Sequence, residues 1–234
     1  MGTRETHLRE IVKSKKYTVI DESSDRELRN ALITSSYNEE IAEIYKSECT
    51  NQARDKGLGG VLDDYPRGFK KWDISARDIL TEGRFHIELD EEQHFNRYRR
   101  ITLMSCFYQK ENVFSPEQLG QYKQFCEKFE GRCRHDGKFW SNPSADEQFG
   151  MASPRGDFSG NGSSRWKQRA FYDFLKDITQ LTEKTPLIRI SIYDTICING
   201  DERLVGDLLE SDQYMDYAPE ILALIEKRLE WRRK

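Results

Sequence analysis

The spacing of apolar and polar positions divides the chain into helical and strand-like segments. Residues 5–17 have a short helical pattern, and the run Tyr17–Ile20 reads as a short strand. Residues 25–56 read as helix, for which Gly57 is a natural end. The stretch 57–68 is rich in glycine and contains proline, so it predicts turns.

Three further runs predict strands. Residues 69–76 and 84–90 alternate apolar and polar side chains, and Thr81-Glu-Gly83 between them is a hairpin turn signal. Residues 186–193 are almost continuously apolar, as expected of a central strand. We expect Arg189 in this run to reach the end of the sheet, because a buried unpaired charge is costly.

The remaining segments predict helices and a long loop. Residues 116–131 begin with Ser115 as N-cap and Pro116 in the first turn. Residues 164–182 form an amphipathic helix, and a final helix covers 217–232. The outward side of the 164–182 helix carries Lys167, Arg169, Lys176 and Asp177. Residues 91–107 predict a turn followed by a helix or a long strand. Residues 132–164 predict a loop. This order predicts an α/β (α+β) protein with one mixed central sheet flanked by helices.

Composition limits the function classes. The 234 residues include 37 Lys and Arg against 41 Asp and Glu, a net charge of −4, so nucleic acid could bind only through a local basic face. No run of 18 apolar residues exists, which excludes a helical membrane protein. Five cysteines without framework spacing, and a charged segment Met1–Glu5 without an apolar run, lead us to expect a cytoplasmic protein with reduced thiols.

Three carboxylates make the densest chemical signal. On a strand over 84–90, Glu88 and Asp90 project from one face while Ile87 and Leu89 project from the other. A hairpin would bring Asp73 beside them. Three such oxygen ligands suit a hard cation such as Mg²⁺ or Mn²⁺, which lowers the pKa of a bound water and stabilises charge on a scissile phosphate. The alternative is a solvated acidic edge strand.

The segment 69–103 carries a family resemblance. Its Trp-Asp pair at 72–73, Glu88-Leu-Asp90 and Gln93-His94 resemble the core of the PD-(D/E)XK nuclease superfamily, closest to the branch that includes very-short-patch-repair-like endonucleases. Cores of that branch have a strand bearing Asp, then a strand of the form apolar-Glu-x-Asp-Gly-x-x-His, then a basic segment. Residues 173–177 and 187–190 resemble the closing helix and strand of such a core.

The resemblance implies a restriction-endonuclease-like fold and a metal-dependent nuclease, with DNA as the expected substrate. The chain length suits a single domain over 1–234, and the pattern gives it an N-terminal helical region at 1–56. The nuclease-like core would comprise 57–106 and 164–234, and residues 107–163 would be an insertion of a helix and a long loop. Restriction-type nucleases often cut both strands as dimers, which leaves a homodimer open.

Residues around the predicted metal ligands Asp73, Glu88 and Asp90 are candidates for further roles. His94 could act as general base or orient the attacking water, two roles to which histidine side chains are suited, or it could be a partly buried histidine bonded to the sheet. Gln93 could orient the same water or lie on the surface. The side chains expected to bind phosphates are Arg97, Arg99, Arg100, Lys167, Arg169 and Lys176.

Related folds often add a glutamate from the first helix to the metal site, and Glu40 or Glu43 could serve here.

One departure from the family pattern keeps a second function open. Asp90 stands where most of the superfamily has lysine, although this branch often has an acid there. A catalytically inactive nuclease-like fold that acts as a nucleic-acid-binding or protein-interaction module is therefore the alternative. A third hypothesis is an unrelated α+β interaction protein whose acidic strand is only surface.

Overall fold

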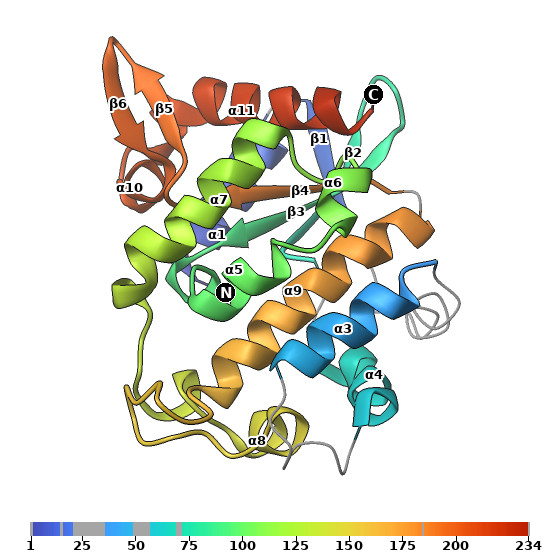
Figure 1. The fold of residues 1–234 in the computed structure, drawn as a ribbon. Coiled ribbons are helices and arrows are strands. Elements are labelled where there is room, and N and C mark those ends of the chain that lie inside the picture. Colours follow the sequence, from blue (N-terminus) through green and yellow to red (C-terminus); the bar gives the residue numbers. More distant parts are fainter. Residues whose placement is uncertain are drawn as a thin grey trace. The chain divides into compact units, whose positions relative to one another are not determined.

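The computed structural model describes residues 2–14, 16–20, 36–48, 57–68, 72–183 and 185–233, and it is a mixed α/β structure (Figure 1). The chain divides into two compact units. The first unit comprises Met1–Ser23, Lys71–Glu91 and Lys184–Lys234, and the second unit comprises Ser24–Lys70 and Glu92–Glu183. The first unit is therefore discontinuous in sequence. The prediction of a single domain with an insertion at 107–163 stays a prediction.

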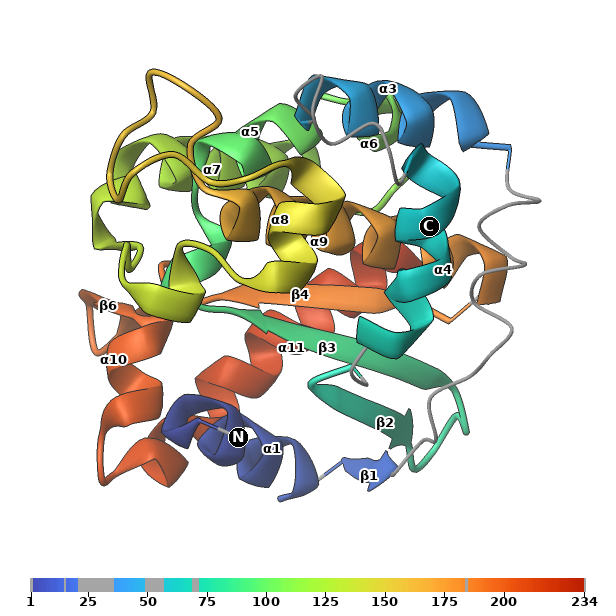
Figure 2. The same cartoon turned by 90° about the horizontal axis from the view of Figure 1, so that it is seen from below.

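A four-stranded mixed sheet forms the centre of the first unit. Its strands are β1 (Tyr17–Ile20), β2 (Ile74–Asp78), β3 (Arg84–Asp90) and β4 (Leu187–Ser191), and they lie in that order (Figure 2). The pairs β1–β2 and β2–β3 are antiparallel, while β3 and β4 are parallel. The predicted mixed sheet is confirmed, and β3 has the bounds that the sequence predicts.

The hairpin between β2 and β3 follows from its turn residues. The Asp78 N–H donates to the Gly83 carbonyl at 2.9 Å, and the Asp78 carboxylate accepts from the N–H groups of Leu80 and Thr81. Glu82 takes a left-handed φ of 57°, and Gly83 follows it. The predicted turn at 81–83 is confirmed, whereas the predicted strand 69–76 is displaced to 74–78, and residues 69–71 lie outside the described residues.

Helices and a small hairpin complete the first unit. Helix α1 (Thr3–Lys13) packs beside α10 (Val205–Glu210), as Figure 2 shows, and α11 (Ala218–Arg232) contacts β4. The short element η5 (Tyr214–Tyr217) precedes α11. The hairpin of β5 (Thr195–Ile198) and β6 (Asp201–Leu204) was not expected from the sequence. The predicted helix over 217–232 is confirmed by α11.

The second unit is helical in its described residues. Its long helix α9 (Ser164–Glu183) packs against α3 (Asn38–Glu48), α5 (Arg97–Thr102) and α8 (Pro143–Phe149) (Figure 1). Helix α9 confirms the prediction for 164–182. The other elements are α4 (Gly57–Gly68), α6 (Phe107–Lys110), α7 (Pro116–Phe129) and the short helices η2 (Glu92–His94), η3 (Glu130–Arg132) and η4 (Gly137–Phe139).

Two predictions for the second unit are wrong. Residues 57–68 form α4 rather than turns, because Val61 and Leu62 give the segment an apolar side that is buried. The predicted loop at 132–164 contains α8, which Asn142 caps by accepting from the Ala145 N–H. The predicted helix 25–56 lies partly outside the described residues, which within it cover 36–48.

Helix α7 shows the predicted start. Ser115 Oγ accepts from the Gln118 N–H at 3.1 Å, and Pro116 occupies the first turn. The helix ends at Phe129, two residues before the predicted end, because η3 takes over. No described helix is both long and apolar enough to cross a bilayer.

Candidate functional site

Asp73 and Glu88 meet across the β2–β3 pair in the first unit. Ile74 lies opposite Ile87, so one step along the antiparallel register Asp73 faces Glu88. The Asp73 N–H donates to Glu88 Oε1 at 3.3 Å, and Asp73 Oδ2 accepts from the Leu89 N–H at 2.8 Å. Residues opposite each other in this register project from one face of the sheet. The structure thus brings together two of the three predicted carboxylates.

Asp90, the third predicted carboxylate, forms a buried ion pair. Its Oδ1 accepts from Nη1 of Arg189 on β4 at 2.7 Å, and both side chains are 1% exposed. The expectation that Arg189 reaches the end of the sheet is wrong, because the negative charge of Asp90 compensates its burial. Within the described residues, Asp73, Glu88 and Asp90 do not offer three ligand atoms that all lie within 4.8 Å of one another.

His86 lies on the same strand face as Glu88 and Asp90. Its ring stacks on Trp72 at 4.6 Å between centroids, and Nδ1 shares a hydrogen bond with Ser75 Oγ at 2.9 Å. Burial, assisted by the positive charge of Arg84, lowers the pKa of His86 to about 4. The imidazole is therefore neutral at physiological pH.

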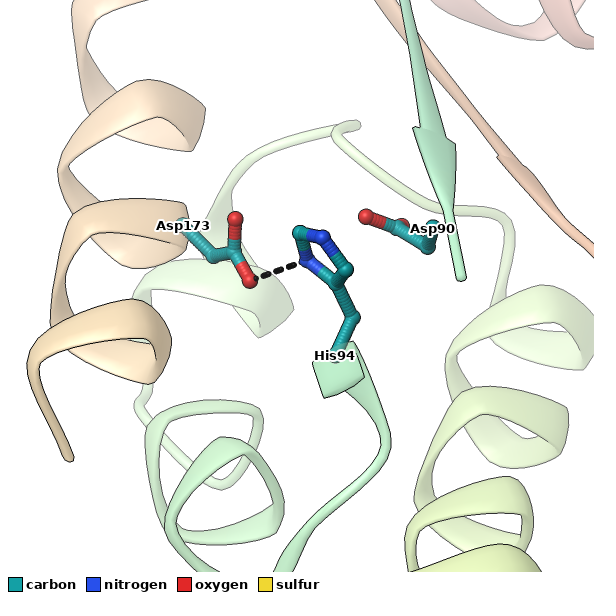
Figure 3. A group of neighbouring side chains, drawn as sticks. All are labelled: Asp90, His94 and Asp173. Carbon is teal, nitrogen blue, oxygen red and sulfur yellow. Dashed lines mark hydrogen bonds and ion pairs between the residues drawn. The ribbon is translucent and has the colours of Figure 1, made fainter. Parts of the chain in front are cut away.

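His94, a predicted residue of the second unit, contacts two charged side chains of α9. It lies at the end of η2, and its Nδ1 is 2.8 Å from Oδ2 of Asp173 on α9 (Figure 3). Its Nε2 is 2.9 Å from Nη1 of Arg169. Figure 3 also draws Asp90, which ends β3 in the first unit. Aspartate and neutral histidine are both ordinary ligands of divalent metal ions.

The tautomer of His94 follows from these two partners. A guanidinium has no acceptor atom, so Nε2 must accept from Arg169. The proton of the neutral ring is therefore on Nδ1, which donates to Asp173. Because its basic nitrogen faces a cation, this arrangement gives no support to His94 as a general base, and that role stays a prediction. Gln93 is half-buried in η2, where its carbonyl accepts from Asn96 Nδ2.

One predicted phosphate contact is wrong. The side chain of Arg99 is 2% exposed and its Nη2 pairs with Asp177 Oδ2 at 2.8 Å, while Tyr108 donates to the same oxygen. The phosphate of a bound nucleic acid could not reach this guanidinium. Asp177 is likewise buried, against the expectation that it lies on the outer side of α9.

The other predicted cations of the second unit differ in exposure. Arg97 and Arg100 are exposed and pair with Glu130 and Glu127, at 2.6 Å in each case. Lys167, expected on the outer side of α9, is buried and its Nζ donates to Asn161 Oδ1.

Arg169 and Lys176 are half-buried on α9. Of the two glutamates considered for the metal site, Glu40 contacts Lys110 at 3.4 Å, and Glu43 is exposed.

Sequence reasoning missed the partners of these residues. Arg189, Asp173 and Asp177 supply the charges that fix Asp90, His94 and Arg99, and each partner lies more than 70 positions away in sequence. Glu48 was missed as well: both of its carboxylate oxygens are buried, and neither has a hydrogen-bond partner among the described residues. Burial raises its pKa well above the usual range, although the charge of Lys167 acts in the opposite direction.

Residues 55–211, well over half of the chain, match the model of DUF7255, described as a family of unknown function. The chain belongs to the DUF7255 family. Neither the curated proteins nor the solved structures contain a match to this DUF7255 protein. The matched segment covers β2, β3, β4 and α9, and therefore the carboxylates of the first unit and the His94–Asp173 pair of the second.

Proposed function

We propose that this DUF7255 protein is a metal-dependent nuclease that hydrolyses phosphodiester bonds, with DNA as the expected substrate. The proposal includes a restriction-endonuclease-like core at 57–106 and 164–234, with the four-stranded sheet of the first unit as its sheet. Mg²⁺ or Mn²⁺ is the expected cofactor. Asp73 and Glu88 are its expected ligands.

The order of elements supports this core. The strands occur in the order that the resemblance implies. Asp73 precedes β2, the antiparallel strand β3 carries Glu88 and Asp90, and β4 later in the chain is parallel to β3. The intervening helix α9 begins and ends close to the expected bounds. Mixed sheets of this kind occur in many folds, so the sheet alone does not indicate a function, and the proposal depends on the pair of carboxylates.

The observation that carries the proposal is the pairing of Asp73 with Glu88. Two carboxylates that face each other across antiparallel strands are held in fixed positions by the N–H groups of Asp73 and Leu89. Mg²⁺ is commonly bound by one or two carboxylates, with waters and substrate phosphates completing its octahedron. A third protein carboxylate is therefore not required, and these two residues fit the ion.

A bound Mg²⁺ would activate water and stabilise the charge that develops on the scissile phosphate. The chain's own contribution is to hold the two carboxylates in place. Glu88 is 2% exposed, so little solvent competes with it for a cation. Asp90 is not a ligand in this proposal, because its charge is already paired with Arg189.

The ion pair between Asp90 and Arg189 also favours the second candidate function. A carboxylate neutralised by a buried guanidinium is a weaker metal ligand than one surrounded by water and backbone N–H groups. An inactive nuclease-like protein that only binds nucleic acid would keep this pair for stability. The two candidates differ in whether any phosphodiester bond is broken.

Cleavage assays distinguish them. Purified protein is incubated with supercoiled plasmid, linear duplex, single-stranded DNA and RNA, in Mg²⁺, in Mn²⁺ and in chelator. We expect metal-dependent cleavage of DNA, and a decrease of about a hundredfold or more in Glu88→Gln and Asp73→Asn, because several kcal/mol of charge stabilisation is lost. The exposed residues Glu202 and Asp212 of the same unit provide matched controls, Glu202→Gln and Asp212→Asn.

The outcomes are distinct. Full cleavage by Glu88→Gln would exclude the proposed site. Binding of DNA by the wild-type protein without cleavage in either metal would favour the inactive module. Absence of both binding and cleavage by well-folded protein would contradict both candidate functions.

A further inference from the structure

One side of helix α9 carries a row of charged residues at intervals of four. Arg165, Arg169 and Asp173 recur at i, i+4 and i+8, so their side chains follow one another along the same side of the helix. All three belong to the second unit and are partly or fully buried. His94 joins this row through its contacts with Asp173 and Arg169.

Arg169 is held in position by a neutral partner. Its Nη1 donates to His94 Nε2 at 2.9 Å, and the ring is fixed in turn by Asp173 at 2.8 Å. This chain of contacts orients the guanidinium but does not neutralise it directly. Among the described residues no carboxylate forms an ion pair with Arg169, and its guanidinium, which has five N–H donors, makes one hydrogen bond there, to His94.

Arg165 is a second guanidinium of the same kind. It donates to Gln168 Oε1, a neutral amide, and no ion pair to it occurs among the described residues. Burial lowers its pKa to about 10, the positive charge of Arg169 adds to this effect, and the charges of Tyr172 and Asp173 oppose it. Two like charges one helical turn apart destabilise each other, so the free protein holds this pair at a cost in stability.

We propose that Arg165 and Arg169 form an anion-binding site that holds a phosphate group, with His94 and Asp173 as positioning residues. Planar guanidinium groups match the oxygens of a phosphate in bidentate geometry, and this match is stronger than that of a lysine. A bound anion would also remove the repulsion between the two arginines.

The chemical class of the ligand is a phosphate monoester or diester. Its source is either the backbone of a nucleic acid or a free phosphorylated small molecule, and the two share this chemistry. The site does not depend on the proposed nuclease activity, because binding is expected without metal and without bond cleavage. It adds Arg165 to the residues that recognise phosphate, and it gives His94 a role other than proton transfer.

Binding is measured by calorimetry in chelator, with the intact chain. One arm titrates the protein with inorganic phosphate, and chloride is removed as phosphate is added so that the ionic strength stays constant. The other arm uses a short single-stranded oligonucleotide that lacks terminal phosphates. We expect Arg169→Met and Arg165→Met to lose at least about tenfold in affinity, as removal of a charge-assisted hydrogen bond implies. Arg155 is exposed in the same unit, and Arg155→Met is the matched control.

The variants Arg165→Lys and Arg169→Lys keep the charge and test the geometry. Weakened binding by the lysine variants, with melting temperatures equal to that of the wild-type protein, supports a bidentate site. Stronger binding of the oligonucleotide assigns the site to a nucleic-acid backbone, and stronger binding of inorganic phosphate assigns it to a small ligand. Equal affinity in wild-type, Arg165→Lys and Arg169→Lys proteins, or no binding in either arm, would overturn the proposal. Loss of nuclease activity in Glu88→Gln would leave these results unchanged.

Discussion

Acid should weaken the fold through one histidine, His86. This side chain is 2% exposed and lies against Trp72 and Ser75. Its pKa is about 4 in the folded protein against 6.5 for an unperturbed histidine. The unfolded chain therefore takes up a proton between these two pH values, whereas the folded protein does not. Stability is fully present above pH 6.5 and decreases as the pH falls toward 4.

The size of this effect follows from the two pKa values. Each unit of difference corresponds to about 1.4 kcal/mol, so the full change is about 3 kcal/mol, of which most has been lost by about pH 4.5. Other carboxylates and histidines also titrate in this range. The contributions of these other groups cancel when the unfolding free energies of two proteins that differ only at residue 86 are subtracted, provided that the groups lie away from residue 86.

Urea unfolding of the wild-type protein and His86→Gln provides that difference. The free energy of unfolding is measured for both proteins at pH 7.5, 6.5, 5.5 and 4.5. We expect the wild-type protein to lose about 2–3 kcal/mol relative to His86→Gln between the first and last pH, because glutamine does not titrate. A difference between the two proteins that stays constant over this range would refute the assignment of a buried neutral histidine.

Three further predictions concern the interior. Arg99→Met should lower the free energy of unfolding by about 3–5 kcal/mol, because it leaves Asp177 buried without its cation. Arg100 is exposed, so Arg100→Met should lower it by less than about 1 kcal/mol, and urea unfolding measures both values. Glu48→Gln should raise the melting temperature at pH 8 more than at pH 5, because the raised pKa of Glu48 makes its ionisation unfavourable in the folded protein and stability is lost as pH rises. Amide hydrogens of 187–191 should exchange among the slowest in the chain, as mass spectrometry can test, since this strand is buried throughout.

The sequence predicted elements that local patterns determine. Strand 84–90 is recognisable from its alternation and from the turn at 81–83, and α7 from Ser115 and Pro116. Helix α4 was missed because glycine and proline normally favour turns, and here the burial of Val61 and Leu62 outweighs that preference.

The partners of charged residues could not be predicted in the same way. Arg189 was expected at the sheet end because a lone buried charge is costly, and Arg99 was expected to bind phosphate. Each is instead buried against an aspartate that is distant in sequence. Lys167 has a nearby partner, Asn161, but it lies in a segment predicted as loop. Arg169 was predicted from the sequence to bind phosphate, but the sequence did not show that His94 and Asp173 hold it in position or that Arg165 lies one turn before it on the same side of α9.

The parallel pairing of β3 with β4 has a consequence for how the chain is made. Strand β3 ends at Asp90 and β4 begins at Leu187, and nearly all residues between them belong to the second unit. During synthesis, almost a hundred residues are therefore added after β3 before β4 exists to pair with it. Until then one edge of β3 is open and can pair with a strand of another chain. Closing so long a segment is also slow. We expect the helices of the second unit to form while β3 is still incomplete, so that a ribosome stalled before residue 187 would present a folded helical unit beside an open, aggregation-prone sheet.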